Sequence, residues 1–177
     1  MNYLSQYTIS FSGLKEGIHL FDFSADNRFF DEFEESEIRK GNIKIQVKLE
    51  KRSTYLRLTF GLKGEVELIC DRCLENYFQS IESSNQMLVK FSETEIDDGD
   101  EVIYIHPGSH QVEIGKLIYE FIVLSIPIRH IHSDDKDGKS LCEPEMLHKL
   151  EEYRAIDLLE VNPIDPRWND LKKIIDK

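Results

Sequence analysis

The chain has 177 residues, 40% of them hydrophobic, which suggests one domain with a real core, or one such domain plus an appended segment. No stretch approaches the roughly 20 apolar residues that span a bilayer, and the first residues lack the pattern of a signal peptide, so we expect a cytoplasmic protein with no membrane partner. A net charge of −12 argues against indiscriminate nucleic-acid binding over the whole surface.

Strands dominate the predicted N-terminal half. They are expected over residues 7–11, 19–23, 43–50, 55–63, 66–70 and 78–91. Apolar and polar residues alternate most strictly in 43–50 and 55–63, and the turn 51–54 between them predicts a hairpin. A short helix is expected over 27–33, and the last strand is expected to break near Ser83 and Ser84.

Helices dominate the predicted C-terminal half. An acidic solvated loop is expected over 93–101 and a short strand over 102–105. Two helices are expected over 112–126 and 143–153. A linker over 162–166 then leads to a last helix from 166 onward. Apolar residues at helical spacing from Ile114 predict that the first of these helices is mostly buried, and Pro127 ends it. Asp165 is expected to cap the last helix, with Pro166 at its first position.

The order of strands first and helices afterwards predicts an α+β fold. We expect an antiparallel β-sheet, arranged as a meander or a partly closed barrel, with the helices of the C-terminal half packed on one face or end. Residues 1–160 are predicted to form a single α+β domain, and residues 161–177 a linker and C-terminal helix.

Three cysteines and one histidine form a candidate metal site. Cys70 and Cys73 have the spacing at which one turn supplies two ligands, and His132 and Cys142 are the candidates for the other two in a tetrahedral structural zinc site. His130 competes with His132 for the histidine position. Two alternatives remain open: reduced cysteines packed as small apolar groups, and a redox pair, although a redox pair usually begins a helix and this pair ends a strand.

A basic hairpin is the candidate RNA-binding surface. The segment 39–63 holds eight basic residues and a single acid. The predicted phosphate contacts are Lys44, Lys48, Lys51, Arg52, Arg57 and Arg72. Tyr55 is predicted to stack on an unpaired base. The alternative is the ordinary solvated outer face of a strand pair.

Motifs of enzymes are missing from the sequence. It contains no Gly-x-Gly-x-x-Gly, no phosphate-binding loop, no His-Glu-x-x-His and no Gly-x-Ser-x-Gly. The acidic residues lie in runs that solvation explains. We therefore predict a protein that is not an enzyme, and a metal-dependent or redox enzyme stays as the least favoured alternative.

Several segments resemble one known family. The segment 66–75 contains Cys-Asp-Arg-Cys-Leu and resembles the strand followed by Cys-x-Arg-Cys-Leu of the YceD family, the large ribosomal RNA subunit accumulation proteins. The segments 112–120 and 124–127 resemble the start and the Leu-x-Leu-Pro end of the family's helix, and the Asn-Pro of 162–163 with the basic helix after it resembles its C-terminal segment. His132 and Cys142 fall where family members often carry His or Cys. The resemblance covers roughly residues 40–177.

This resemblance implies a bacterial cytoplasmic factor that supports accumulation of large-subunit ribosomal RNA and brings no enzymatic activity with it. Its expected partners are ribosomal RNA or pre-ribosomal particles, and ribosomal proteins. From the charge pattern we expect the basic hairpin to contact RNA while the acidic remainder limits nonspecific binding. The alternative function is a protein-interaction adaptor that holds a basic ribosomal protein, through an exposed strand edge or the C-terminal helix around Trp168.

Overall fold

A computed structural model describes residues 3–34, 36–94, 99 and 101–154 of the chain. The chain divides into two compact units, Met1–Cys142 and Glu143–Lys177, and each is described by itself. The predicted boundary between residues 160 and 161 and the predicted C-terminal helix lie outside the described residues, so both stay predictions. Among the described residues, no helix is long and apolar enough to cross a membrane.

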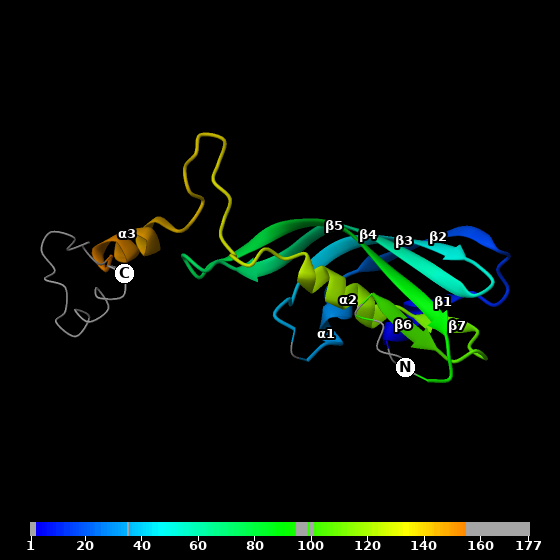
Figure 1. Cartoon of the computed structure of the whole chain (residues 1–177). Coiled ribbons are helices and arrows are strands. Elements are labelled where there is room, and N and C mark those ends of the chain that lie inside the picture. The colour runs from blue at the N-terminus through cyan, green and yellow to red at the C-terminus, as the bar shows by residue number, and fades with distance from the viewer. Residues whose placement is uncertain (1–2, 35, 95–98, 100, 155–177) are drawn as a thin grey trace, which may run out of the picture. The chain divides into compact units, whose positions relative to one another are not determined.

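The first unit is built on a five-stranded sheet (Figure 1). Its strands are β2 (Gly17–Ala25), β3 (Gly41–Lys51), β4 (Tyr55–Ile69), β5 (Asn76–Phe91) and β6 (Val102–Ile105), in the spatial order β2-β3-β4-β5-β6. The first four strands pair antiparallel in chain order, and β6 pairs parallel to β5. The predicted α+β class with a largely antiparallel sheet is therefore confirmed. Because the sheet is open, the meander is the observed form and the partly closed barrel is not.

Smaller elements cover one face of this sheet (Figure 1). They are the 3-10 helix η1 (Tyr3–Gln6), the helices α1 (Asn27–Asp31) and α2 (Gly115–Leu124), and a two-stranded sheet of β1 (Thr8–Ser10) and β7 (Gln111–Glu113). The Asp26 carboxylate accepts a 3.2 Å hydrogen bond from the backbone N–H of Phe29 and so caps α1. The described part of the second unit contains one helix, α3 (Pro144–Glu152), close to the predicted 143–153.

The core lies between the sheet and this cover. Alternate residues of β3, from Ile43 to Leu49, are fully buried, while the residues between them are exposed. The aromatic ring of Phe60 on β4 packs against that of Phe121 on α2, with the ring centroids 5.1 Å apart. The period-two pattern therefore places one face of the sheet against α2 and leaves the other, here called the outer face, in solvent.

Three predicted details differ from the structure. The strands expected over 55–63 and 66–70 form the single strand β4, and residues 112–113 of the expected helix belong to β7, so that α2 begins at Gly115. The break expected near Ser83 and Ser84 does not occur, and β5 runs unbroken from Asn76 to Phe91. The two serines pair in register with Leu62 and Gly61 of β4, so the hydrogen-bonded ladder carries the strand across a stretch of weak strand formers.

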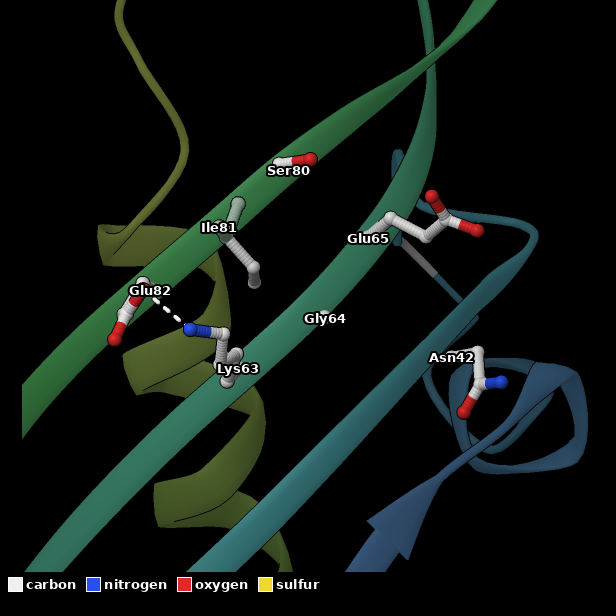
Figure 2. A pocket seen from close by; sticks show the side chains of 7 residues that line it. All are labelled: Asn42, Lys63, Gly64, Glu65, Ser80, Ile81 and Glu82. Carbon is white, nitrogen blue, oxygen red and sulfur yellow. Dashed lines mark hydrogen bonds and ion pairs between the residues drawn. The ribbon is translucent and has the colours of Figure 1, made fainter.

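Gly64 marks a close approach of β3 and β4 (Figure 2). A Cβ atom there would overlap the backbone carbonyl of Asn42 and come within 2.7 Å of the Cα atom of Ile43. Both obstacles are backbone atoms, which cannot move aside without disturbing the ladder. A side chain at Gly61, on the same strand, would meet nothing closer than the Gln46 carbonyl oxygen at 3.8 Å.

We therefore expect Gly64→Ala to lower the free energy of unfolding by about 2 kcal/mol or more, as overpacking against a rigid neighbour does. The matched variant Gly61→Ala should stay within about 1 kcal/mol of the wild type, because its methyl group fits. Chemical denaturation of both variants measures the difference. Equal stabilities would contradict the close approach of the two strands.

Candidate metal centre and RNA-binding surface

The cysteine pair lies in the loop 70–75 that joins β4 to β5. Within it, the Cys70 N–H donates to the Glu75 carbonyl oxygen and the Leu74 N–H donates to the Cys70 carbonyl oxygen, both at 2.9 Å. Leu74 has a φ of 63°, the left-handed conformation that closes a tight turn. This backbone turns the thiols of Cys70 and Cys73 to the same side, where both are buried.

A second segment folds back onto this loop. The backbone N–H of Asp71 donates to the His130 carbonyl oxygen at 2.6 Å, and the N–H of His130 donates to the Asp71 carboxylate at 2.7 Å. The guanidinium of Arg72 donates to the Ser140 hydroxyl at 3.2 Å. These contacts hold the segment 126–142 against the end of the sheet. They bring His132 and Cys142 next to the cysteine pair although both are far away in sequence.

The four donor atoms form a compact cluster. The Sγ atoms of Cys70, Cys73 and Cys142 and a ring nitrogen of His132 all lie within 4.8 Å of one another. Cys70 and Cys142 Sγ are 3.7 Å apart, and His132 Nδ1 lies 3.5 Å from Cys73 Sγ and 3.7 Å from Cys142 Sγ. A tetrahedral zinc ion with its usual bond lengths of about 2.3 Å to sulfur and 2.0–2.1 Å to nitrogen requires edges of about 3.5–3.8 Å, so the donor set fits this metal.

Burial and local hydrogen bonds act on the thiols in opposite directions. Burial disfavours the Cys70 thiolate, but backbone hydrogen bonds from Cys73, Arg72 and His132 and the His132 side chain outweigh it and lower the pKa of Cys70 to about 6. Burial raises the pKa of Cys142. One thiolate is thus favoured before any metal binds, as a thiolate metal site requires.

The surroundings of Cys70 and Cys73 argue against the two alternatives to a metal site, a redox pair and simple apolar packing. The loop leads from one strand into the next, without the helix start that usually lowers both thiol pKa values of a redox pair. Simple apolar packing of the cysteines does not account for an imidazole nitrogen turned toward two thiols. His130, the competing histidine, contacts this site through its backbone groups, whereas His132 contributes its ring.

The predicted basic residues fall into two groups. Lys44, Lys48 and Arg57 are exposed on the outer face, and Tyr55 and Arg52 lie beside them at the hairpin turn. Lys51 is engaged elsewhere: its ammonium donates to the carbonyl oxygens of Phe11 at 2.9 Å and Leu14 at 2.8 Å. Arg72 belongs to the metal centre through Ser140. The structure therefore gathers Lys48, Arg52, Tyr55 and Arg57 at the hairpin end of the outer face. Lys44 lies further along β3 opposite Lys63, and the other two residues hold loops.

Glu50 is the carboxylate within this group. It receives the guanidinium Nε of Arg52 at 2.9 Å and the Nη1 of Arg57 at 3.2 Å. The hydrogen bond from Arg52, together with the charges of Arg57 and Lys48, lowers the pKa of Glu50. Lys44 and Lys48 have no carboxylate partner in the part of the chain that the structure describes.

Sequence reasoning missed two residues of the outer face near the hairpin, Lys90 and Tyr104. Lys90 on β5 lies directly opposite Tyr55, and Tyr104 on β6 lies opposite Lys90, so both share the outer face. We call the outer-face cations that extend from the hairpin turn along β3 to Lys44 the cationic surface, which consists of Lys44, Lys48, Arg52, Arg57 and Lys90. Among the described residues, their neighbours on this face include three carboxylates: Glu50, Asp22 on β2, and Glu65 on β4, diagonally opposite Lys44. The alternation within β5 and β6 could have indicated Lys90 and Tyr104 only if the register between these strands and β4 had been known.

The outer face changes character further along β4 (Figure 2). A shallow pocket there is lined by residues that include Asn42, Lys63, Glu65 and Glu82. The Lys63 ammonium and the Glu82 carboxylate form an ion pair at 3.0 Å, drawn as the dashed line in Figure 2. With Glu65 beside this neutral pair, the pocket does not favour a phosphate group.

Comparisons with known proteins give one match. The family model described as "Large ribosomal RNA subunit accumulation protein YceD" matches residues 58–175, which include all four candidate metal ligands. No curated protein and no solved structure matches the chain significantly.

Proposed function

The chain belongs to the YceD family, and from this premise we propose that it supports accumulation of large-subunit ribosomal RNA by contacting that RNA, or pre-ribosomal particles, in the cytoplasm. The observation that carries the proposal is the cationic surface. Its five cations stand on the outer face of the sheet, on a chain whose net charge is −12. Such an arrangement attracts a polyanion to one face and repels it elsewhere.

The proposed role is not enzymatic. In our proposal Cys70, Cys73, His132 and Cys142 hold a structural zinc ion. Three of these side chains are buried, and four protein donors fill a tetrahedral ion, which leaves no position for a water or a substrate. Bound zinc would fasten the segment 126–142 to the loop 70–75, at the end of β4 opposite the hairpin turn.

The alternative, an adaptor for a basic ribosomal protein, has one observation in its favour. β2 is an edge strand of the sheet, and Ile18 and Leu20 on it are 59% and 61% exposed. An exposed strand edge with apolar side chains can pair with a strand of another protein. Trp168, the other predicted contact, lies outside the described residues.

Capture of the tagged full chain from cells, with and without ribonuclease treatment, separates the two functions. We expect large-subunit ribosomal RNA and its bound proteins to be captured together, and ribonuclease to release those proteins. Crosslinking in living cells, followed by sequencing of the attached nucleotides, should then give sites in large-subunit RNA. Ribosomal proteins that stay bound after ribonuclease, with no RNA crosslinks, would support the adaptor and overturn RNA contact.

A further inference from the structure

Part of β5 forms an edge of the sheet. β4 pairs with β5 along its whole length, but β6 pairs with it only from Leu88 onward. Near the start of β5, the segment 131–134 lies beside residues 77–80 and lines a cavity with them. In Figure 2, β4 adjoins β5 on one side of Ile81, and none of the described strands adjoins it on the other. We call residues 82–86, which lie between these two covered stretches, the open edge.

The register shows which backbone groups the open edge presents. The N–H of Leu88 donates to the Glu101 carbonyl oxygen at 2.8 Å, on the side of β5 that faces away from β4. Because backbone groups alternate sides along a strand, the N–H and C=O groups of Glu82, Ser84 and Gln86 point to that side too. None of these groups has a hydrogen-bond partner in the part of the chain that the structure describes.

The open edge lacks the features that usually keep strand edges from pairing, which are lysines, prolines and β-bulges. Its sequence, Glu-Ser-Ser-Asn-Gln, contains neither lysine nor proline, and the register with β4 continues through it without a bulge. Its single charged residue, Glu82, forms an ion pair with Lys63 at 3.0 Å. The backbone groups are therefore accessible to an added strand.

An apolar groove lies beside one end of the open edge. Met87, the next residue of β5, lines this groove together with Phe121, Val123 and Leu124 of α2. Val123 and Leu124 are 42% and 76% exposed although both are large and apolar. Every second side chain of an added strand points to the α2 side of the sheet, where the groove accommodates an apolar residue.

The charges around the open edge favour a basic partner. Glu101 lies at its β6 end and closes the segment 93–101, which contains six acids. Asp134 lines the cavity at the other end. Glu120 lines the apolar groove, where Lys116 pairs with it at 3.7 Å. These carboxylates attract cationic side chains and repel acidic ones.

We propose that the open edge binds a short extended segment of another protein as an added strand, and that this segment alternates basic and apolar residues. Its backbone bonds to Glu82, Ser84 and Gln86, and one of its apolar side chains fills the groove. The inference does not depend on RNA contact, because it uses a different part of the sheet. A second copy of this chain is a poor occupant, because its own sixteen-residue β5 would run into β6 at Leu88.

Binding of labelled nine-residue peptides to the full chain tests the chemistry of the partner. A peptide that alternates lysine and valine should bind at least about 10-fold more tightly than one that alternates lysine and proline, which has the same charge but half the backbone donors. It should also bind more tightly than a peptide that alternates glutamate and valine. Equal binding of the proline peptide, tighter binding of the glutamate peptide, or no binding of any of the three would overturn the inference.

Substitutions in the full chain test the position of the site. Ser84→Pro removes an N–H that takes no part in the ladder with β4, so it should weaken binding of the lysine–valine peptide about 10-fold, while Ser84→Ala binds as the wild type does. Leu124→Lys, at the groove, should also weaken it. Leu20→Lys is the matched control without expected effect, because Leu20 is 61% exposed on β2, at the opposite edge of the sheet. Weaker binding in Leu20→Lys alone would place the site on β2 and overturn the inference.

A second measurement uses the unchanged protein, so a folding defect in a variant does not weaken the test. In the free chain the amide hydrogens of Glu82, Ser84 and Gln86 should exchange fast, and those of Ser83 and Asn85 slowly, since only the latter two face β4. The lysine–valine peptide should slow exchange at the first three. Slow exchange there without the peptide, or protection only at other residues, would overturn the inference. A dimer that protects the same three amides would make a second copy the occupant and would overturn it as well.

Discussion

His132→Ala is expected to lower the zinc affinity of the protein by at least about 100-fold, whereas His130→Ala leaves it unchanged. Substitutions of groups that merely orient a ligand already cost about 10- to 100-fold in metal affinity, and removal of a ligand costs at least as much. The ring of His132 lies 3.5 Å from Cys73 Sγ and 3.7 Å from Cys142 Sγ. His130 is two residues away and contacts Asp71 through its backbone, which alanine retains.

Elemental analysis of the purified full chain should give one zinc per wild-type and His130→Ala molecule, and much less for His132→Ala. Competition with a chromogenic chelator then gives the affinities. Cys142→Ser should also lower the zinc affinity, as His132→Ala does, because Cys142 is another of the four proposed ligands and lies in the same segment as His132. Zinc in none of the proteins, or equal zinc in both histidine variants, would contradict the proposed ligand set.

Loss of zinc should act locally and not unfold the sheet. The core residues of β3 and β4 pack against α2 and do not depend on the metal. Hydrogen exchange after zinc removal should therefore accelerate in the loop 70–75 and the segment 126–142, while the amides of β3 and β4 keep their protection. Global unfolding on zinc removal would show that the metal has a larger role than a clamp.

The sequence predicted the elements whose signal is local. Alternation in 43–50 and 55–63 indicated the central hairpin, because a strand buried on one face must repeat every two residues. The Cys-Asp-Arg-Cys run indicated a turn able to hold a metal, because this signal is also local: both thiols belong to one turn. The family resemblance drawn from that run and from the helix after residue 112 is confirmed by the match over 58–175.

Features that depend on long-range register could not be predicted. Lys90 lies opposite Tyr55 through the antiparallel register of β4 and β5. Tyr104 joins them only because β6 pairs parallel to β5 across an acidic segment, and no local pattern encodes that pairing. Lys51 looked like Arg52 in the sequence, yet its ammonium binds the carbonyl groups of Phe11 and Leu14, about 40 residues away in the chain. Side chains of the same type, next to each other, therefore have different roles that only the fold determines.

Replacing Lys44 and Lys48 together with alanine is expected to weaken RNA binding by about 10- to 100-fold at low salt. Each phosphate contact contributes about 0.7–0.9 to the slope of log K against log salt concentration, so the double variant should lose about 1.5 from that slope. These two lysines are a suitable choice, because neither forms an ion pair with a carboxylate in the described part of the chain. Their removal therefore breaks no such ion pair, and Glu50, on which the charge of Lys48 acts, keeps its contacts with Arg52 and Arg57.

Titration of labelled RNA at several salt concentrations measures both the affinity and the slope. Lys116→Ala is the positional control, because Lys116 is an exposed lysine on α2, which covers the opposite face of the sheet. It differs from Lys44 and Lys48 in its 3.7 Å ion pair with Glu120. A substitution at Glu50 should change the RNA affinity in the opposite direction, because the Glu50 carboxylate contacts Arg52 and Arg57. Glu50→Gln should tighten RNA binding and steepen the slope, since it frees both guanidinium groups for phosphate.

Together the three variants test the position of the contact and not only its charge. A protein that binds RNA through net charge alone would respond equally to the loss of any lysine, so Lys116→Ala would weaken binding about half as much as the double variant. Contact through the cationic surface requires instead that Lys116→Ala has no effect, that the double variant lowers the slope and that Glu50→Gln raises it. An unchanged slope in the double variant would separate RNA binding from this surface, and the role of the chain in ribosomal RNA accumulation would then depend on another part of the molecule.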